Sequence, residues 1–113
     1  MGMKSRNKGK RGEREAAAEV SRLFRTEANR GCQFAGGADS PDIRTAIEQV
    51  HFEVKRAEAL RLYAALAQAA RDAGERIPVV LHKQNRQPWV AIVRLDDLPQ
   101  LAVQLYLTLA QNT

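Results

Sequence analysis

The chain is poor in the residues that most often hold metals or disulfides, with one cysteine, Cys32, and two histidines, His51 and His82. A single cysteine cannot form an internal disulfide, which fits a reducing cytoplasm and excludes a cysteine-rich zinc site. Two histidines make a metal held by several imidazoles an unfavourable hypothesis. Any metal is therefore expected to be a hard cation bound by carboxylates.

Aromatic residues and long apolar runs are also scarce. Phe, Trp and Tyr make up 5% of the 113 residues, so base stacking is not the expected way of recognising nucleic acid. The sequence has no apolar stretch long enough to span a membrane and no signal-peptide pattern. We therefore expect a cytoplasmic protein with no membrane partner.

Positive charge, in contrast, is in excess. Lys and Arg number 18 against 13 Asp and Glu, giving a formal charge of +5. A small basic protein is attracted to polyanions, of which nucleic acid is the commonest. The length and a hydrophobic content of 44% suit one domain with one core. Basic residues crowd the start, so we predict a flexible basic arm over residues 1–11, which could also be merely solubilising, and a single domain over residues 12–113.

Hydrophobic periodicity predicts an α/β fold, a mixed sheet with helices packed against it. The expected order is helix, three strands, helix, two strands, helix. Helices are predicted over residues 12–25, 57–73 and from about 97 onward. Strands are predicted over residues 31–35, 42–47, 50–55, 77–81 and 89–95.

The last of these helices is apolar on nearly every face. Leu98, Leu101 and Leu105 lie on one side, and Tyr106 and Leu107 lie on others. A small domain cannot cover every face of its terminal helix, so such a helix usually packs against something more. We expect a homodimer formed through an apolar surface that includes this helix.

The strand over residues 50–55 alternates apolar and polar residues. This period of two places Glu53 and Lys55 on one face with His51, while Val54 between them is anchored in the core. A charged pair of this spacing is common on strand faces and predicts little by itself. His51 is expected to be a packed or hydrogen-bonded strand residue.

Asp42 follows Pro41 and stands eleven residues before Glu53, so it can begin or end a neighbouring strand. Residues of one face on adjacent antiparallel strands lie roughly 5 Å apart. Two carboxylates that close repel each other, and a shared divalent cation relieves the repulsion. Lys55 beside that cation could orient or help deprotonate an attacking water, or stabilise charge developing on a phosphate.

Glu13 lies at the beginning of the apolar stripe of the first predicted helix, where a carboxylate is costly without a partner. It is a candidate for a further metal ligand, direct or through water. Taken alone, Glu13 could instead complement the helix dipole, and Asp42 could be a simple turn residue after proline. Their joint occurrence with the Glu53-Val54-Lys55 segment favours phosphodiester chemistry.

These residues, in this order, resemble the motifs of the PD-(D/E)xK nucleases. Residues 8–14 are similar to the start of archaeal-type Holliday junction resolvases, and residues 83–89 look like phage and prophage relatives of that group. Gln68 matches a glutamine that those resolvases carry in the helix after Glu-x-Lys. The resemblance covers roughly residues 8–98. It departs at Arg56, where those proteins have a small hydroxyl residue, and in the chain's short length, which leaves junction specificity open.

The resemblance implies a restriction-endonuclease-like mixed central sheet flanked by helices, and a dimeric, Mg²⁺-dependent endonuclease, with Mn²⁺ as a substitute, that cuts four-way DNA junctions. The implied catalytic residues are Glu13, Asp42, Glu53, Lys55 and Gln68. The implied metal contacts are Glu13, Asp42, Glu53 and Val54.

The DNA-binding residues expected from charge and position are Lys8, Lys10, Arg11, Arg14, Ser40, Arg56, Lys83 and Arg86. Two alternatives stay open. The protein could be a nuclease of this superfamily that acts on flap or duplex DNA, or a non-catalytic basic DNA-binding protein on the same scaffold.

Overall fold

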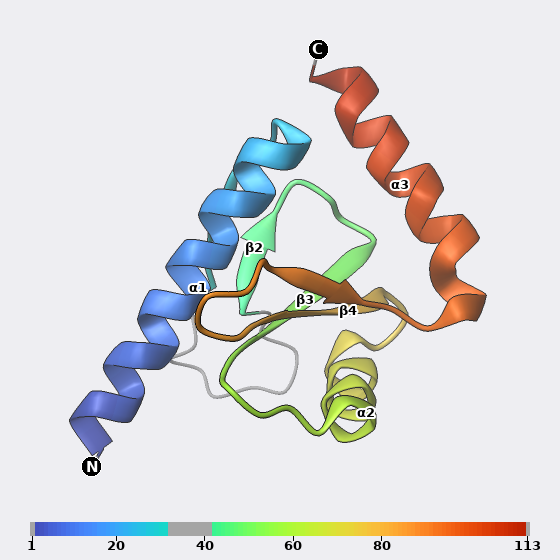
Figure 1. The fold of residues 1–113 in the computed structure, drawn as a ribbon. Helices are drawn as coiled ribbons and strands as arrows, with labels where there is room; N and C mark the ends of the chain where they lie inside the picture. Colours follow the sequence, from blue (N-terminus) through green and yellow to red (C-terminus); the bar gives the residue numbers. More distant parts are fainter. Residues whose placement is uncertain (1, 32–41, 113) are drawn as a thin grey trace.

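A computed structural model describes residues 2–31 and 42–112, with side chains described from residue 9 onward. The order of helices and strands is the predicted one (Figure 1). The elements are α1 (Gly2–Phe24), β1 (Ala28–Arg30), β2 (Ile43–Thr45), β3 (Val50–Arg56), α2 (Leu62–Ala73), β4 (Ile77–Lys83), β5 (Val90–Ile92), a 3-10 turn (Leu95–Asp97) and α3 (Leu98–Gln111).

The five strands form one mixed sheet in the order β1-β2-β3-β4-β5. Strands β3 and β4 are parallel, and every other neighbouring pair is antiparallel. Parallel neighbours need a crossover connection, which α2 provides between β3 and β4. The apolar run that begins β4 is buried from Ile77 to Val80, as expected for a strand covered on both faces.

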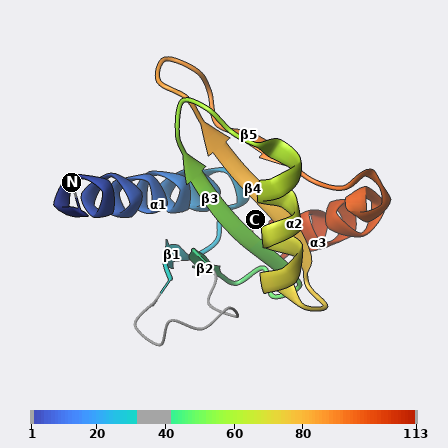
Figure 2. The same ribbon diagram turned by 90° about the horizontal axis from the view of Figure 1, so that it is seen from below.

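The sheet lies between two layers of helices, α1 with α3 on one face and α2 on the other (Figure 2). On the first face, Phe52 and Val79 pack with Leu101 of α3 and with the alanine-rich stripe of α1. On the second face, Val80 packs against Ala69 of α2. More buried apolar side chains lie on the face covered by α1 than on the face covered by α2, so the α1 face holds most of the core. Full burial of one large apolar side chain contributes about 1.5–3 kcal/mol.

Helix α1 begins ten residues before the predicted start. Residues 2–11, predicted as a flexible arm, are helical in the structure and continue into the rest of α1. Lys and Arg are good helix formers, so a basic segment can extend a helix. The helix was predicted to begin at Gly12 because glycine commonly marks the boundary of a helix. A Cβ atom added at Gly12 would lie 2.6 Å from Cβ of Arg56, so this glycine permits a close approach within the helix.

Helix α2 begins at Leu62, five residues after the predicted start. Ala57 is not helical, because its backbone forms hydrogen bonds with β4. The backbone N–H of Ala57 donates to the carbonyl of Lys83 at 3.2 Å, and His82 Nε2 lies 2.8 Å from the carbonyl oxygen of Ala57. Strand β1 also differs, since it spans Ala28–Arg30, whereas most of the predicted strand 31–35 lies outside the described residues.

The solvent-facing side of α1 carries the charges that its periodicity assigns there. Arg22 donates a hydrogen bond of 3.0 Å to Glu19, three residues earlier. That hydrogen bond, aided by the charge of Arg22, lowers the pKa of the Glu19 carboxyl and raises the pKa of the guanidinium. This exposed i, i+3 pair on α1 stabilises the helix.

Candidate functional site

Strand β3 and helix α2 bring the polar residues of the predicted motif together. Glu53 and Lys55 share the face of β3 that α2 covers, as their spacing predicts. Lys55 Nζ donates a hydrogen bond of 3.1 Å to Oε1 of Gln68 in the middle of α2. Two residues that the resemblance implies as catalytic are therefore in contact.

Asp42 lies immediately before β2, beside the same part of β3. Its Oδ2 accepts a hydrogen bond of 2.7 Å from the backbone N–H of Val54. The antiparallel register pairs Ile43 with Phe52, and one further step sets Asp42 opposite Glu53. The backbone of Asp42 is fixed from both sides, by the N–H of Gly31 at 2.8 Å and by the carbonyl of Phe52 at 3.3 Å.

Glu13 has the charged partner that its place on the apolar stripe requires, and the partner is Arg30 of β1. Arg30 Nε donates to Glu13 Oε1 at 2.7 Å, and the Glu13 side chain is only 14% exposed. The adjacent Gly12 packs on Arg56, which places Glu13 near the end of β3. Glu13 therefore approaches the same end of the sheet as Asp42 and Lys55, but from the α1 layer, whereas Lys55 faces α2.

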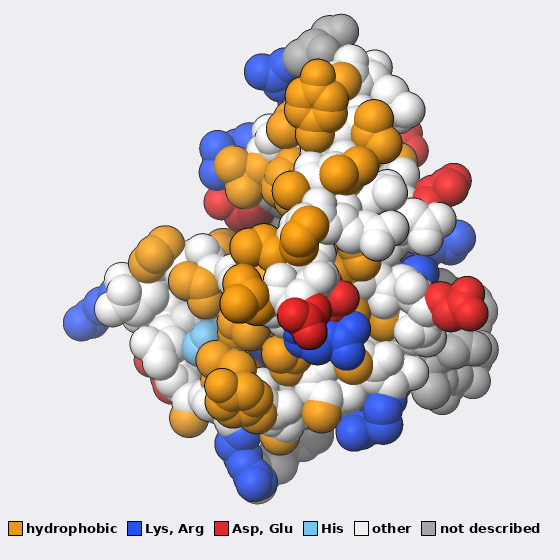
Figure 3. Space-filling view, turned by 90° about the vertical axis from the view of Figure 1, so that its right-hand side faces the viewer, with side chains coloured by type: hydrophobic (Ala, Val, Ile, Leu, Met, Phe, Trp, Pro, Cys, Tyr) orange, Lys and Arg blue, Asp and Glu red, His pale blue; other side chains and the backbone are white. Residues whose placement is uncertain are grey.

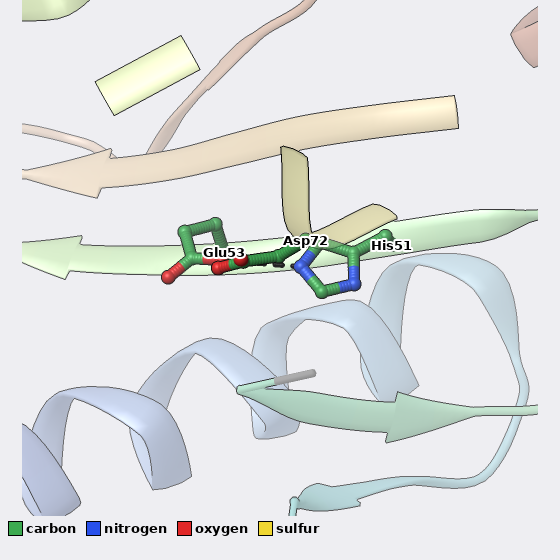
Figure 4. Close-up of side chains that lie close together, drawn as sticks. All are labelled: His51, Glu53 and Asp72. Carbon is green, nitrogen blue, oxygen red and sulfur yellow. Dashed lines mark hydrogen bonds and ion pairs between the residues drawn. The ribbon is translucent and has the colours of Figure 1, made fainter. Parts of the chain in front are cut away.

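A compact cluster of three titratable side chains adjoins these residues. His51 Nε2 lies 3.1 Å from Oε1 of Glu53, and both residues are buried. Asp72, in the last turn of α2, joins them, and one ligand atom from each of the three lies within 4.8 Å of the others (Figure 4). This cluster could hold a metal ion.

The prediction that His51 is packed and hydrogen-bonded is confirmed, whereas the role of Asp72 was missed. Asp72 lies four residues after Gln68, so the two share a face of α2 with the buried Ala65, Ala69 and Ala73. Two polar residues on an otherwise alanine-lined stripe were the signal in the sequence that could have identified Asp72.

The predicted DNA-binding residues differ in their exposure and in their contacts with the rest of the protein. The exposed ones are Lys10, Arg11 and Arg14 on α1 and Arg86 in the turn after β4; Lys83, just before that turn, is partly buried. Arg56 is engaged within the protein, where it donates to Asn85 Oδ1 at 2.7 Å and to the carbonyl of Lys83 at 3.3 Å. The Lys8 side chain and Ser40 lie outside the described part of the chain.

The apolar character of α3 leaves a large hydrophobic surface. Among the described residues, only Leu101 and Thr108 of this helix are buried, whereas Val103 is 53% and Tyr106 69% exposed. Figure 3 shows hydrophobic side chains gathered on this side of the molecule. An apolar cavity of about 160 Å³, lined by Trp89 and residues of α1, α3 and the sheet, opens nearby. The domain therefore does not cover its terminal helix, as predicted.

No protein-family model, curated protein or solved structure matches the chain. Over residues 2–31 and 42–112, no helix has the length and apolar character needed to cross a bilayer. The function is therefore inferred from the chemistry of the residues and their geometry.

Proposed function

We propose that this protein is a metal-dependent endonuclease that cleaves branched DNA, acting as a homodimeric Holliday junction resolvase. The observation that carries the proposal is the 2.7 Å hydrogen bond from the Val54 amide to Asp42 Oδ2. This hydrogen bond holds the Asp42 carboxylate beside the segment of β3 that carries Glu53 and Lys55. The α-β-β-β-α-β-β-α order and the mixed sheet are those that the resemblance to PD-(D/E)xK nucleases implies.

The donor atoms at this end of the sheet suit a hard cation. The Asp42 and Glu53 carboxylates and the main-chain oxygen of Val54 are the ligands that Mg²⁺ and Mn²⁺ favour. The Glu53 side chain is only 8% exposed, and a buried carboxylate is costly without a positive partner. When bound, the metal would polarise a phosphoryl oxygen and lower the pKa of a bound water.

Lys55 would supply the positive group that acts on the phosphate, and Gln68 would hold it in position. The 3.1 Å hydrogen bond to Gln68 Oε1 holds the Lys55 ammonium on the face of β3 that also carries Glu53, a proposed metal ligand. An ammonium fixed there can orient the attacking water and stabilise the charge that develops during cleavage. Glu13, whose carboxylate accepts a hydrogen bond from Arg30 at 2.7 Å, would contribute a further ligand through water from the α1 layer.

Exposed basic residues would contact the DNA backbone. Lys10, Arg11 and Arg14 lie on α1, and the N-terminal part of that helix extends past the sheet in Figures 1 and 2. Arg86 adds a positive group near the end of β4. Such contacts neutralise phosphates and are independent of sequence, which suits recognition of DNA shape. Two copies joined through the α3 surface would present two sites related by a twofold axis.

Two other functions fit the same residues less well. A nuclease acting on flap or duplex DNA would use the same site with a different fit to the strands. A non-catalytic DNA-binding protein would have no use for Asp42 and Glu53, because carboxylates near phosphate weaken binding unless a cation neutralises them. The close approach of Asp42 to the Glu53-Val54-Lys55 segment therefore favours a nuclease.

A synthetic four-way junction and a duplex of equal length separate the three functions. Each substrate is incubated with the protein in Mg²⁺, in Mn²⁺ and with a chelator, and the products are mapped on both strands. The resolvase proposal expects paired symmetric nicks in the junction only, and none with the chelator. Cutting of both substrates would favour the broader nuclease, and binding without cutting in either metal would refute both nuclease hypotheses.

A further inference from the structure

The side chains between β3 and α2 form two successive polar layers. Gln68 meets Lys55, and Asp72, one helical turn later, meets Glu53 and His51. The helix runs opposite to the strand, so the i, i+4 spacing on α2 matches the i, i+2 spacing on β3. The proposed cleavage reaction uses the first layer and, from the second layer, Glu53 alone. It gives no role to His51 or Asp72.

The separations in the second layer are those of ligands around one cation. A metal with bonds of about 2.1 Å to an imidazole nitrogen and a carboxylate oxygen holds those two atoms about 3 Å apart. His51 Nε2 and Glu53 Oε1 are 3.1 Å apart, and the whole set of ligand atoms lies within 4.8 Å. Figure 4 shows the three side chains directed toward one another. A cation could bind with only small side-chain movements.

Burial also supports a cation at this cluster. The His51 side chain is fully buried, and its Nε2 atom faces the Glu53 carboxylate. The Glu53 carboxylate next to His51 is also buried. A cation bound between His51 Nε2 and Glu53 would stabilise this buried carboxylate.

We propose that His51, Glu53 and Asp72 form a site for a divalent transition metal, with Mn²⁺, Co²⁺ and Zn²⁺ as the chemical class. One imidazole nitrogen with two carboxylate oxygens favours these ions over Mg²⁺, which prefers oxygen donors alone. Three protein ligands leave a further coordination position open. Asp72 is only partly buried, so the ion can enter from that side.

This site goes beyond the proposed cleavage reaction. It shares Glu53 with the proposed Mg²⁺ site, but it requires neither Asp42 nor any nuclease activity. The proposed metal site and the proposed nuclease therefore depend on different residues and can be tested separately. Co²⁺ binding at the His51, Glu53 and Asp72 cluster should depend on Asp72, whereas DNA cleavage should depend on Asp42.

Cobalt binding to the tag-free protein tests the site directly, since a histidine tag would itself bind Co²⁺. Co²⁺ is titrated into the wild type while its visible absorption is recorded, and Zn²⁺ is then added as a competitor. We expect a saturable absorption band that Zn²⁺ abolishes. In Asp72→Asn, which keeps the size of the side chain, the affinity for Co²⁺ should fall by about tenfold or more.

A matched control variant shows whether any loss of Co²⁺ binding is specific to Asp72. Asp96→Asn removes an exposed carboxylate of the 3-10 turn and should bind Co²⁺ like the wild type. Circular dichroism checks that each variant is folded. Co²⁺ binding that is absent, or equally strong in Asp72→Asn, would overturn the metal site. Asp72-dependent binding without DNA cleavage would retain the site and refute the nuclease, and cleavage without such binding would do the reverse.

Discussion

At the scale of single residues, Asp42 combines a structural contact with a proposed chemical role. Its Oδ2 accepts the Val54 amide at 2.7 Å. Asn retains an oxygen that can accept this bond, whereas Ala leaves a partly buried N–H without a partner. We predict that Asp42→Ala loses about 1–3 kcal/mol of the free energy of unfolding and that Asp42→Asn loses much less. Urea denaturation of the three proteins measures this, and equal losses in both variants would contradict the prediction.

Gln68 is a positioning residue, because it touches Lys55 rather than the substrate. Without its Oε1 the Lys55 ammonium is no longer held at a fixed place. We predict that Gln68→Ala slows cleavage by on the order of tenfold to a hundredfold, with unchanged affinity for DNA. Gln68→Glu keeps an acceptor for Lys55 and should restore most of the rate. A Gln68→Ala protein that cuts like the wild type, or loses DNA binding instead, would argue against this role.

The sequence predicted which face of β3 its polar residues share, but not which residues they contact on other elements. Period two correctly placed Glu53, Lys55 and His51 on one face of a strand, because strand geometry leaves little freedom. It could not reveal that Arg30 pairs with Glu13, or that Asp72 reaches His51. Those contacts depend on how α1 and α2 are set against the sheet, and no local pattern carries that information.

At the scale of elements, α1 contains two glycines that should respond oppositely to substitution. A Cβ at Gly12 would lie 2.6 Å from Cβ of Arg56, whereas a Cβ at Gly9 meets nothing within 4 Å. We predict that Gly12→Ala costs about 1–3 kcal/mol through overpacking. Gly9→Ala, the matched control in the same helix, should be neutral or stabilising by up to about 1 kcal/mol.

Thermal or urea unfolding of the two glycine variants gives the comparison. If Gly12→Ala is as stable as Gly9→Ala, α1 does not pack against β3 as described. The Arg56 side chain also supports the turn after β4 through Asn85. Gly12→Ala should therefore loosen that turn as well, which amide hydrogen exchange in residues 84–88 would detect.

Helices and strands could be predicted where the spacing of apolar residues along the sequence is regular. Strands β3 and β4 came out close to their observed bounds, because alternation and a continuous apolar run are distinct signals. The starts of α1 and α2 were wrong for a tertiary reason. Gly12 serves helix packing instead of marking an end, and residue 57 bonds to β4 instead of to the helix.

At the scale of the whole molecule, the exposed apolar face of α3 predicts self-association. We expect a dimer by light scattering at micromolar concentration. A charge in that face should dissociate it, so Tyr106→Glu should be monomeric. Tyr63→Glu is the matched control, because Tyr63 is 84% exposed but lies on α2, in the opposite layer. A wild-type monomer, or a dimer that survives Tyr106→Glu and dissociates in Tyr63→Glu, would contradict this interface.

The proposed function depends above all on Asp42, which acts with Glu53 and Lys55 on phosphodiester bonds. Its role is tested by comparing the wild type with Asp42→Asn on the same four-way junction, following cleavage in Mg²⁺ and binding in a gel-shift assay. We predict that Asp42→Asn abolishes cleavage and binds the junction as tightly as the wild type or more tightly, because one negative charge near the phosphates is removed. Loss of binding in the folded variant, or undiminished cleavage, would contradict this role.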